Sequence, residues 1–343
     1  MNFQFFLPDI LNLLTGGNIF NQHLMQELAR HHEVNKKVIS ASAADENNGL
    51  AHSPEDAYWI LDSLLMRNNR FMERVAGFKK SKSKLLLVHY LNILNPENSS
   101  GPDAVQEREN LSIFDGFITT SQYSKQKLVE AGISPQQIAA IQPGITERYL
   151  GESKNRLIIQ ILTVSSIFPG KGLQELLPVL EKLSNLPWQW ILVGEQNLDR
   201  EFSLEFKRQV EHFRLKDRIH ILGPMSQISL FQIYKQSDIF VLNSHFESCS
   251  MVTMEAMSFG LPVLVNRVGG LPELVENGKN GFLVSPGDIQ LFTESLRKLI
   301  SDAHLRVSMG KKAYQRSHSF PSWKESMEKF LNFIPSYDKS PGC

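Results

Sequence analysis

Short apolar runs alternate with segments of helical spacing along the chain, most regularly in its second half. The predicted strands there cover residues 157–164, 188–193, 218–222, 239–242, 263–265 and 282–284. The predicted helices cover residues 173–183, 200–213, 226–235, 250–259, 271–275 and 288–300. Because the strands are apolar at consecutive positions, the pattern predicts a parallel sheet that is covered by helices on both faces.

The first half shows the same alternation with less regular spacing. Its predicted strands cover residues 2–6, 37–40, 85–88, 116–119 and 138–141. Its predicted helices cover residues 18–31, 56–66, 105–113 and 121–131. The sequence therefore predicts two doubly wound α/β halves, and in such sheets ligands bind beyond the carboxyl ends of the strands. A two-domain version would have its site in the cleft between the domains.

A polar stretch at residues 144–156 separates the two halves and has the composition of a linker. We predict an N-terminal Rossmann-like domain over residues 1–148 and a C-terminal Rossmann-like domain over residues 149–320. Residues 321–343 are predicted to form a helix and a tail that pack back on the N-terminal domain.

The composition excludes several classes of protein. The chain has 343 residues, 42% of them hydrophobic, with 36 basic and 36 acidic side chains. This balance creates no overall field that would favour nucleic acid. The two cysteines, Cys249 and Cys343, do not form a disulfide framework, which fits a reducing compartment. No segment approaches the roughly 20 apolar residues that span a bilayer, so we expect a soluble cytoplasmic protein.

Two segments could depart from that description. Residues 1–14 are apolar but lack a basic leader, and we interpret their beginning as a first strand and not as a signal peptide. Residues 79–84 form a small basic cluster. A solvated loop is one interpretation of this cluster, and peripheral attachment to anionic lipid at the inner face of the membrane is the other.

Residues 246–262 carry the strongest chemical signal. Glu247 lies in the loop after the predicted strand 239–242, and Ser250 offers an N-cap oxygen for a helix that contains Glu255. Gly260 is a helix stop. The positive end of this helix would face the crevice beyond the sheet, where an anionic ligand would bind. On spacing alone, two glutamates eight residues apart are also typical of a solvated helix face.

Several motifs in chain order resemble those of retaining glycosyltransferase family 4, also called the group 1 glycosyltransferases. Glu247 and Glu255 have the spacing of the family's E-x7-E motif. The sequences MEAMSFGLPV, VGGLPELV and NGFLV, at residues 254–263, 268–275 and 280–284, continue it. Upstream, the resemblance includes Gly16 and Gly17 with the helix after them, residues 120–127, and PGI at residues 143–145.

The resemblance implies the GT-B fold, with two Rossmann-like doubly wound parallel-sheet domains facing an interdomain cleft. It also implies a retaining, metal-independent transfer of a sugar from a nucleotide diphosphate sugar to an acceptor hydroxyl. The nucleotide sugar is then a substrate, and no cofactor is expected. A sugar or a lipid-linked molecule is the implied acceptor, most often in the synthesis of polysaccharide or glycolipid.

The resemblance assigns roles to residues of the C-terminal domain. Glu255 would accept both ribose hydroxyls, and Glu247 would accept hydroxyls of the transferred sugar. Lys171 would offset the charge of the departing diphosphate. Backbone amides near Gly170 and Gly172 would approach the phosphates. The amides at the start of the helix would add positive dipole; they belong to Ser250, Met251 and Val252.

In the N-terminal domain, Gly16 and Gly17 would leave room for the donor phosphate and the acceptor, and His89 would reach the donor sugar. Other interpretations stay open for each of these. Lys171 could be an ordinary surface lysine, and His89 could be a buried histidine at a strand end. The two glycines could form a simple turn. Cys249 is interpreted as a packing residue, because no neighbour in sequence would activate its thiol.

The sequence also departs from the family pattern. Ser166 stands where the family has an arginine that binds the donor phosphate, and Ser248 and Ser250 stand where it has glycines. Asn243 occupies a frequent proline position. These departures leave the base and the sugar of the donor undetermined. They also keep two other functions open, a catalytically inactive GT-B partner subunit and a GT-B nucleotide-sugar epimerase.

Overall fold

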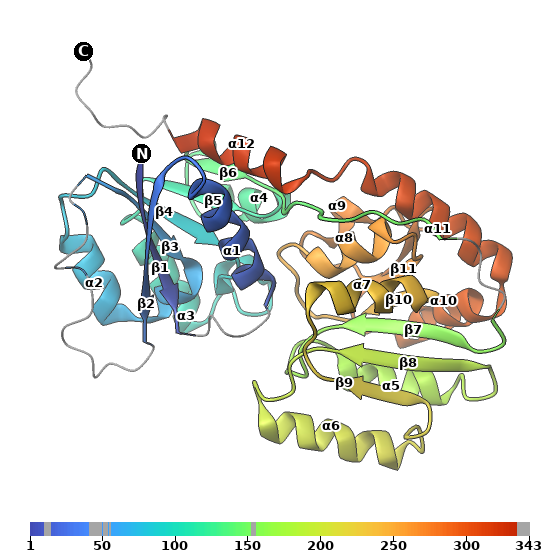
Figure 1. Ribbon diagram of the computed structural model, residues 1–343. Coiled ribbons are helices and arrows are strands. Elements are labelled where there is room, and N and C mark those ends of the chain that lie inside the picture. The colour runs from blue at the N-terminus through green and yellow to red at the C-terminus, as the bar shows by residue number, and fades with distance from the viewer. Residues whose placement is uncertain (10–14, 41–49, 51–53, 55, 152–155, 335–343) are drawn as a thin grey trace. The chain divides into compact units, whose positions relative to one another are not determined.

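The chain forms two α/β units in a computed structural model that describes residues 1–9, 15–40, 50, 54, 56–151 and 156–334. Unit 1 consists of Met1–Gly144 together with Pro321–Cys343, and unit 2 of Ile145–Phe320. Each unit holds a six-stranded parallel sheet (Figure 1). The structural division lies four residues before the predicted domain boundary at residues 148 and 149, and it assigns the C-terminal segment to unit 1.

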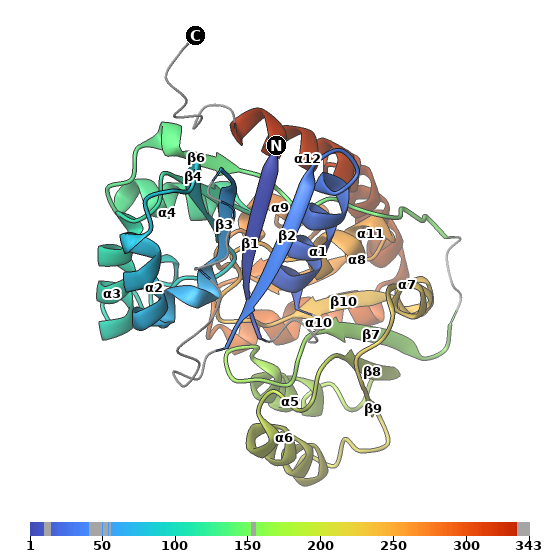
Figure 2. The ribbon, with the colours of Figure 1, turned by 60° about the vertical axis from the view of Figure 1, so that its left-hand side comes forward.

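The sheet of unit 1 has the strand order β2-β1-β3-β4-β5-β6, and β1 and β2 run side by side in Figure 2. Its strands are β1 (Asn2–Pro8), β2 (Glu33–Ile39), β3 (Tyr58–Asp62), β4 (Ser83–Val88), β5 (Gly116–Thr119) and β6 (Ile138–Ala140). Its helices are α1 (Gly16–Leu28), α2 (Asn69–Gly77), α3 (Pro102–Leu111), α4 (Gln122–Glu130) and α12 (Trp323–Phe333). The C-terminal helix α12 packs on α1, where Trp323 stacks on His23 with ring centroids 4.0 Å apart.

The sheet of unit 2 has the order β12-β11-β10-β7-β8-β9. Its strands are β7 (Ile159–Val164), β8 (Trp188–Val193), β9 (Ile219–Leu222), β10 (Ile239–Leu242), β11 (Val263–Asn266) and β12 (Gly281–Val284). Its helices are α5 (Leu173–Glu181), α6 (Arg200–His212), α7 (Gln227–Gln236), α8 (Met251–Ser258), α9 (Leu271–Leu274), α10 (Ile289–Ser301) and α11 (Ala303–Ser317). Two apolar clusters, one for each face of the sheet, form its core. The predicted parallel α/β architecture is confirmed in both units.

The predicted helix at residues 56–66 is wrong. Tyr58–Asp62 is strand β3, which pairs with β1 and β4, and Ser63–Arg67 forms a 3-10 helix after it. Tyr58, Trp59 and Ile60 are all fully buried, because a strand inside a parallel sheet is covered on both faces. Helices α2 and α11 were not predicted.

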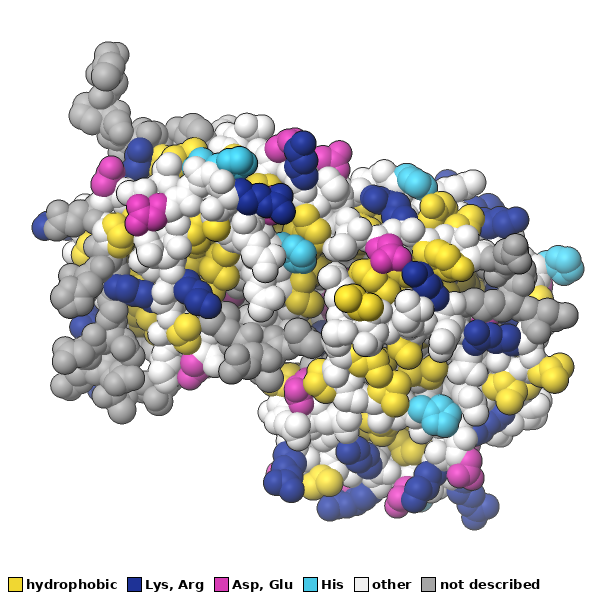
Figure 3. Space-filling model, in the orientation of Figure 1, with side chains coloured by type: hydrophobic (Ala, Val, Ile, Leu, Met, Phe, Trp, Pro, Cys, Tyr) yellow, Lys and Arg dark blue, Asp and Glu magenta, His cyan; other side chains and the backbone are white. Residues whose placement is uncertain are grey.

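Two surface properties follow from the described part of the chain. Within it, no helix is both long enough and apolar enough to cross a membrane. Acidic and basic side chains are interspersed over the face in Figure 3, which agrees with the balanced net charge.

Candidate functional site

An ion pair joins two of the predicted site residues at the carboxyl edge of the unit 2 sheet. Lys171 lies in the loop after β7, and Glu247 lies in the loop after β10. These two strands are neighbours at the centre of the sheet. The Lys171 Nζ is 2.8 Å from the Glu247 Oε1, and the side chains are 32% and 14% exposed. The pair is therefore held by the protein and remains accessible to a ligand from solution.

The loop that carries Lys171 is fixed against the loop after β10. Gly172 has a φ of +62°, and a Cβ atom at this position would collide with the backbone oxygen of Asn243. The Asn243 Nδ2 donates to the Gly172 carbonyl at 2.9 Å, and the His245 amide donates to the Gly170 carbonyl at 2.9 Å. The residue that departs from the family's proline therefore supplies a contact that holds the glycine loop in place.

A third loop, after β11, holds the backbone of Glu247. The Gly270 amide donates to the Glu247 carbonyl at 2.9 Å, and Gly269 has a φ of +51° with no room for a Cβ atom beside that carbonyl. The Asn266 Nδ2 donates to the carbonyls of Asn243 and Ser244 at 3.0 and 3.2 Å. Gly269 is thus explained by the close approach of one backbone to another.

The start of α8 differs from the sequence prediction in one detail. Ser250 is the N-cap residue, but its side chain makes no capping bond to the helix backbone. Its hydroxyl instead lies 2.8 Å from the Thr253 hydroxyl. The prediction that the Ser250 oxygen caps the helix is wrong. The first amides of a helix have no partner within the helix, so those of Met251 and Val252 depend on another acceptor.

Glu255 lies inside α8, half-buried, and makes one side-chain hydrogen bond among the described residues. The Tyr234 hydroxyl on α7 donates to its Oε2 at 2.9 Å. Burial raises the pKa of Glu255 to about 7, and the hydrogen bond from Tyr234 opposes that rise. This carboxyl is therefore near the midpoint of its titration at neutral pH.

The thiol of Cys249 is unsuited to nucleophilic chemistry. Burial raises the pKa of Cys249 well above its usual value, and Glu273 and Glu247 raise it further. Its sulfur contacts the Met254 sulfur at 4.0 Å. Because the thiolate is the reactive form, this environment supports the interpretation of Cys249 as a packing residue.

In unit 1, His89 follows the end of β4 and takes part in a buried polar chain. Its Nε2 is 2.8 Å from the Asn21 Oδ1, and the Asn21 Nδ2 donates to the Asp62 Oδ2 at 2.7 Å. Because the Asn21 oxygen can only accept, the ring donates from Nε2. Burial lowers the pKa of His89, although Asp62 opposes the effect, so the ring is neutral at pH 7.

The two N-terminal glycines lie at the start of α1. Gly16 is its first residue, after the N-cap Thr15, which accepts from the Asn18 amide at 3.2 Å. A Cβ atom on Gly17 would lie 3.1 Å from the ring of His89. Gly17 therefore lets the helix approach the histidine, which is a close contact and not only a turn.

Each unit thus brings together part of the predicted set. Unit 2 places Gly170, Lys171, Gly172 and Glu247 on contacting loops, and Ser166 lies in the same loop as the lysine. Unit 1 places Gly17 against His89. The side chains that hold the predicted site residues, Glu255 included, were not predicted from the sequence; they are Asn21, Asp62, Tyr234 and Asn266. No local pattern marks them, because their partners are distant in sequence.

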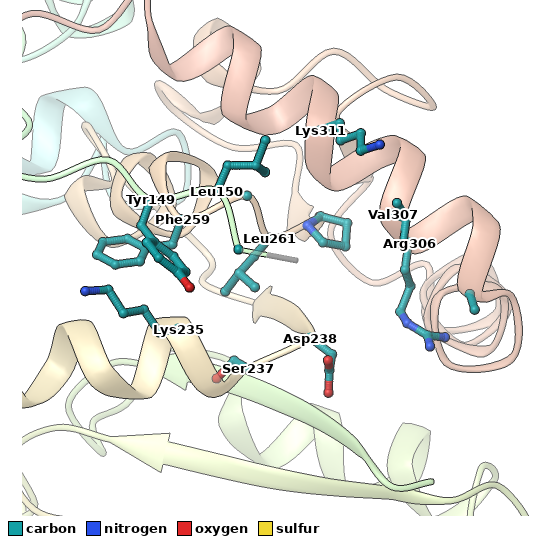
Figure 4. Close-up of a pocket in the computed structure, with 14 residues that line it drawn as sticks. Tyr149, Leu150, Lys235, Ser237, Asp238, Phe259, Leu261, Arg306, Val307 and Lys311 are labelled. Atoms are coloured by element: carbon teal, nitrogen blue, oxygen red, sulfur yellow. The ribbon is translucent and has the colours of Figure 1, made fainter. Parts of the chain in front are cut away.

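A cavity of about 360 Å³ lies at the opposite, amino edge of the unit 2 sheet (Figure 4). Its lining includes Asp238 and Pro262, which precede β10 and β11. Lys235 at its rim pairs with Glu147 at 3.0 Å. The cavity is therefore separate from the Lys171–Glu247 pair, and the predicted site residues do not line it.

Comparison with known proteins finds related sequences for the part of the chain that carries this geometry. Residues 152–316 match the family of group 1 glycosyl transferases. Sulfoquinovosyl transferase SQD2 of Arabidopsis thaliana is 31% identical over 185 residues, which are 53% of this chain and 34% of that protein. A D-inositol 3-phosphate glycosyltransferase of Corynebacterium urealyticum is 28% identical over 64% of this chain and 54% of its own length. The chain thus spans from about a third to about half of these relatives.

Solved structures show the same fold over nearly the whole chain. HepE of Anabaena, in complex with UDP and glucose, has a TM-score of 0.80 at 19% identity, covering 98% of this chain and 100% of its own. Sucrose-phosphate synthase of Thermosynechococcus elongatus has a TM-score of 0.80 at 18% identity, covering 98% and 99%. These similarities confirm the GT-B fold class. The resemblance of the ordered motifs around Glu247 to the group 1 glycosyl transferases is thus confirmed over residues 152–316.

Proposed function

We propose that this protein transfers a sugar from a nucleotide diphosphate sugar to an acceptor hydroxyl, with retention of configuration and without a metal ion. The observation that carries the proposal is the Lys171–Glu247 pair at the carboxyl edge of the unit 2 sheet. A cation and a hydrogen-bonding carboxylate stand there on loops fixed by Gly172 and Gly269. These are the groups that a diphosphate and a sugar need, at the sheet edge where such folds bind nucleotides.

A bound donor would exchange the ion pair for two separate contacts, one with Lys171 and one with Glu247. Its diphosphate would take the Lys171 ammonium and the amides at the start of α8, and its sugar hydroxyls would donate to Glu247. During transfer, the bond from the anomeric carbon to the phosphate oxygen breaks while the acceptor oxygen bonds to the same face of that carbon. The acceptor proton passes to the departing phosphate oxygen. Lys171 would stabilise the negative charge that develops there.

The proposed reaction needs no protein nucleophile, which fits the neutral thiol of Cys249. His89 would contribute from unit 1 as a neutral ring with a fixed tautomer. Catalysis would then rest on positioning and on preorganised charge.

Known proteins support the substrate class. HepE has been solved in complex with UDP, with UDP and glucose, and with UDP-glucose. The named relatives transfer sulfoquinovose or act on D-inositol 3-phosphate. We therefore propose a uridine diphosphate sugar as the first donor to test and a hydroxyl of a polar or lipid-linked molecule as the acceptor. A role in polysaccharide or glycolipid synthesis is part of this proposal.

A thermal-shift screen with UDP, GDP, ADP and their sugars is expected to identify the donor. Binding stabilises the folded state by about 2.7 kcal/mol at a ligand concentration of 100 times Kd. For a unit of this size that corresponds to a rise in Tm of about 5–10 °C. The matching nucleoside monophosphate should give a smaller shift, because it lacks the second phosphate for Lys171. If none of the diphosphates shifts the Tm, the protein does not bind donor and the inactive partner subunit is favoured.

Incubation with the identified donor alone separates transfer from epimerisation. An epimerase would convert the donor without an acceptor, whereas a transferase requires an added hydroxyl compound. Proton NMR of the product then reports the anomeric configuration. An inverted product would contradict the retaining mechanism.

We also propose peripheral attachment to anionic membranes through a basic surface on unit 1. This surface consists of the exposed residues Arg67, Arg70, Arg74, Lys79 and Lys80, on and beside α2. The apolar side of α2 packs inward through Phe71, Met72 and Val75, so the basic surface would act by charge and not by insertion. Each cation close to an anionic surface contributes about 1 kcal/mol.

Co-sedimentation with vesicles tests this surface. The protein is expected to bind phosphatidylserine-containing vesicles, to leave phosphatidylcholine vesicles in the supernatant, and to dissociate at about 0.5 M salt because of screening. The double substitution Lys79→Glu and Lys80→Glu should weaken binding, whereas Lys216→Glu on unit 2 serves as the control. Equal binding to both kinds of vesicle would contradict the charge-based attachment.

A further inference from the structure

Tyr234 and Glu255 form a buried hydrogen bond between α7 and α8. The Tyr234 ring is fully buried and stacks on Phe259, with ring centroids 5.3 Å apart and planes 20° apart. Its hydroxyl lies 2.9 Å from the Glu255 Oε2 and 3.3 Å from the Val252 carbonyl oxygen. Packing thus fixes the ring, and the hydroxyl reaches two acceptors on α8.

The hydroxyl has one proton and therefore donates to one of these acceptors at a time. When Glu255 is ionised, donation to its carboxylate is favoured, because that bond is shorter and charge-assisted. When Glu255 is protonated, its carboxyl can donate to the tyrosine oxygen, and the tyrosine proton can turn to the Val252 carbonyl. The same three oxygens therefore accommodate both protonation states.

The charged groups near this pair have other partners. Lys235, next to Tyr234 on α7, pairs with Glu147 at 3.0 Å. Lys171 pairs with Glu247, in the loop before α8. Arg316 on α11, which packs on α8, donates to the Glu273 carbonyl at 2.8 Å. Within the described residues, Tyr234 is accordingly the side chain that hydrogen-bonds the Glu255 carboxyl.

We propose that Tyr234 is a positioning residue that holds one oxygen of the Glu255 carboxylate and presents the other to the ribose hydroxyls of the nucleotide. This inference rests on the proposed function, in which Glu255 binds the ribose. The geometry favours it because the bond comes from a fixed, fully buried ring to a half-buried carboxylate on the neighbouring helix.

Nucleotide affinity should depend on the protonation of Glu255. Burial raises the pKa of Glu255 to about 7, so below that pH the carboxyl is mostly protonated. A ribose that donates hydroxyl protons favours the ionised form. Nucleotide binding below pH 7 must then release a proton, and the affinity should fall about tenfold for each pH unit below 7. Above pH 7 the affinity should be independent of this group.

The test is the pH dependence of nucleotide affinity for wild type and Tyr234→Phe, between about pH 5.5 and 8.5. The probe is whichever of UDP, GDP and ADP gives the largest thermal shift. Loss of the hydroxyl removes a bond that lowers the pKa of Glu255. The acid limb, which is the part of the profile where nucleotide affinity falls as the pH is lowered, should therefore move to higher pH by about one unit. The control Tyr149→Phe, at a tyrosine that is 41% exposed, should leave the profile unchanged.

Coincident profiles for Tyr234→Phe and wild type would overturn the inference. Glu255→Gln should abolish the acid limb, and if that variant keeps wild-type affinity the assignment of Glu255 to the ribose is wrong. A wild-type protein that binds none of the three nucleotides would instead overturn the proposed function. Should Tyr234→Phe fail to fold, uniform incorporation of 3-fluorotyrosine supplies a stronger donor and should move the limb to lower pH; an unmoved limb would count against Tyr234.

Discussion

Replacement of Lys171 by alanine is expected to lower kcat by a factor of about 100 to 1,000, the usual effect of removing one electrostatic group that acts on a developing oxyanion. Lys171 is the cation placed beside Glu247 at the carboxyl edge of the unit 2 sheet. Turnover of the identified donor under saturating conditions provides the measurement. Lys171 is expected to stabilise the charge of the departing diphosphate and to contribute little to the stability of the fold.

Glu247→Ala is expected to reduce turnover to a similar degree, because the sugar loses its hydrogen-bond acceptor. Both variants should keep a Tm within a few degrees of wild type, since a partly exposed ion pair contributes only about 0–1 kcal/mol. Lys216→Ala is a matched control, because Lys216 forms an exposed pair with Glu211 at 3.1 Å. Full activity in both site variants would rule out the assigned roles.

Gly172→Ala is expected to be far more damaging than alanine at a glycine with positive φ whose Cβ atom would meet open space. A residue with a Cβ atom in this backbone region costs about 1–2 kcal/mol by itself. At Gly172, with a φ of +62°, the new atom would also collide with the Asn243 backbone oxygen. The glycine loop would have to move away from the loop after β10, and Lys171 would lose its position beside Glu247.

Gly287→Ala isolates the collision from the backbone strain. Gly287 has a φ of +82°, and its Cβ atom would meet nothing within 4 Å. Calorimetry should show a larger fall in Tm for Gly172→Ala than for Gly287→Ala, and donor affinity should fall only in the former. Equal effects in the two variants would mean that the contact with Asn243 does not hold the loop.

The second half of the chain could be predicted closely because local and tertiary signals agree there. A strand that is buried on both faces, such as β10 (Ile239–Leu242), is a continuous apolar run in the sequence. Helices α7 and α10 begin where Ser226 and Asp288 accept from the backbone, which is visible from residue type alone. In the first half, the predicted helix at residues 56–66 is wrong, because an apolar strand and the 3-10 helix after it together have the length of an α-helix.

The candidate site was predictable only in part. Lys171, Glu247 and Glu255 were predicted because they belong to short motifs whose spacing is visible in the sequence. Tyr234 and Asn243 were missed as functional partners because their bonds join residues 21 and 71 positions apart. Such contacts form only when the fold brings segments that follow different strands next to each other. A sequence without its fold does not specify them.

The pairing of Lys171 with Glu247 also bears on how a reaction cycle would end. After transfer, the nucleoside diphosphate no longer carries the sugar whose hydroxyls occupied Glu247. The carboxylate can then return to within 2.8 Å of the lysine, the distance in the structure, and compete with the diphosphate for the same cation. The glutamate would thus act as an internal displacing anion, loosening the spent nucleotide while leaving an intact donor undisturbed.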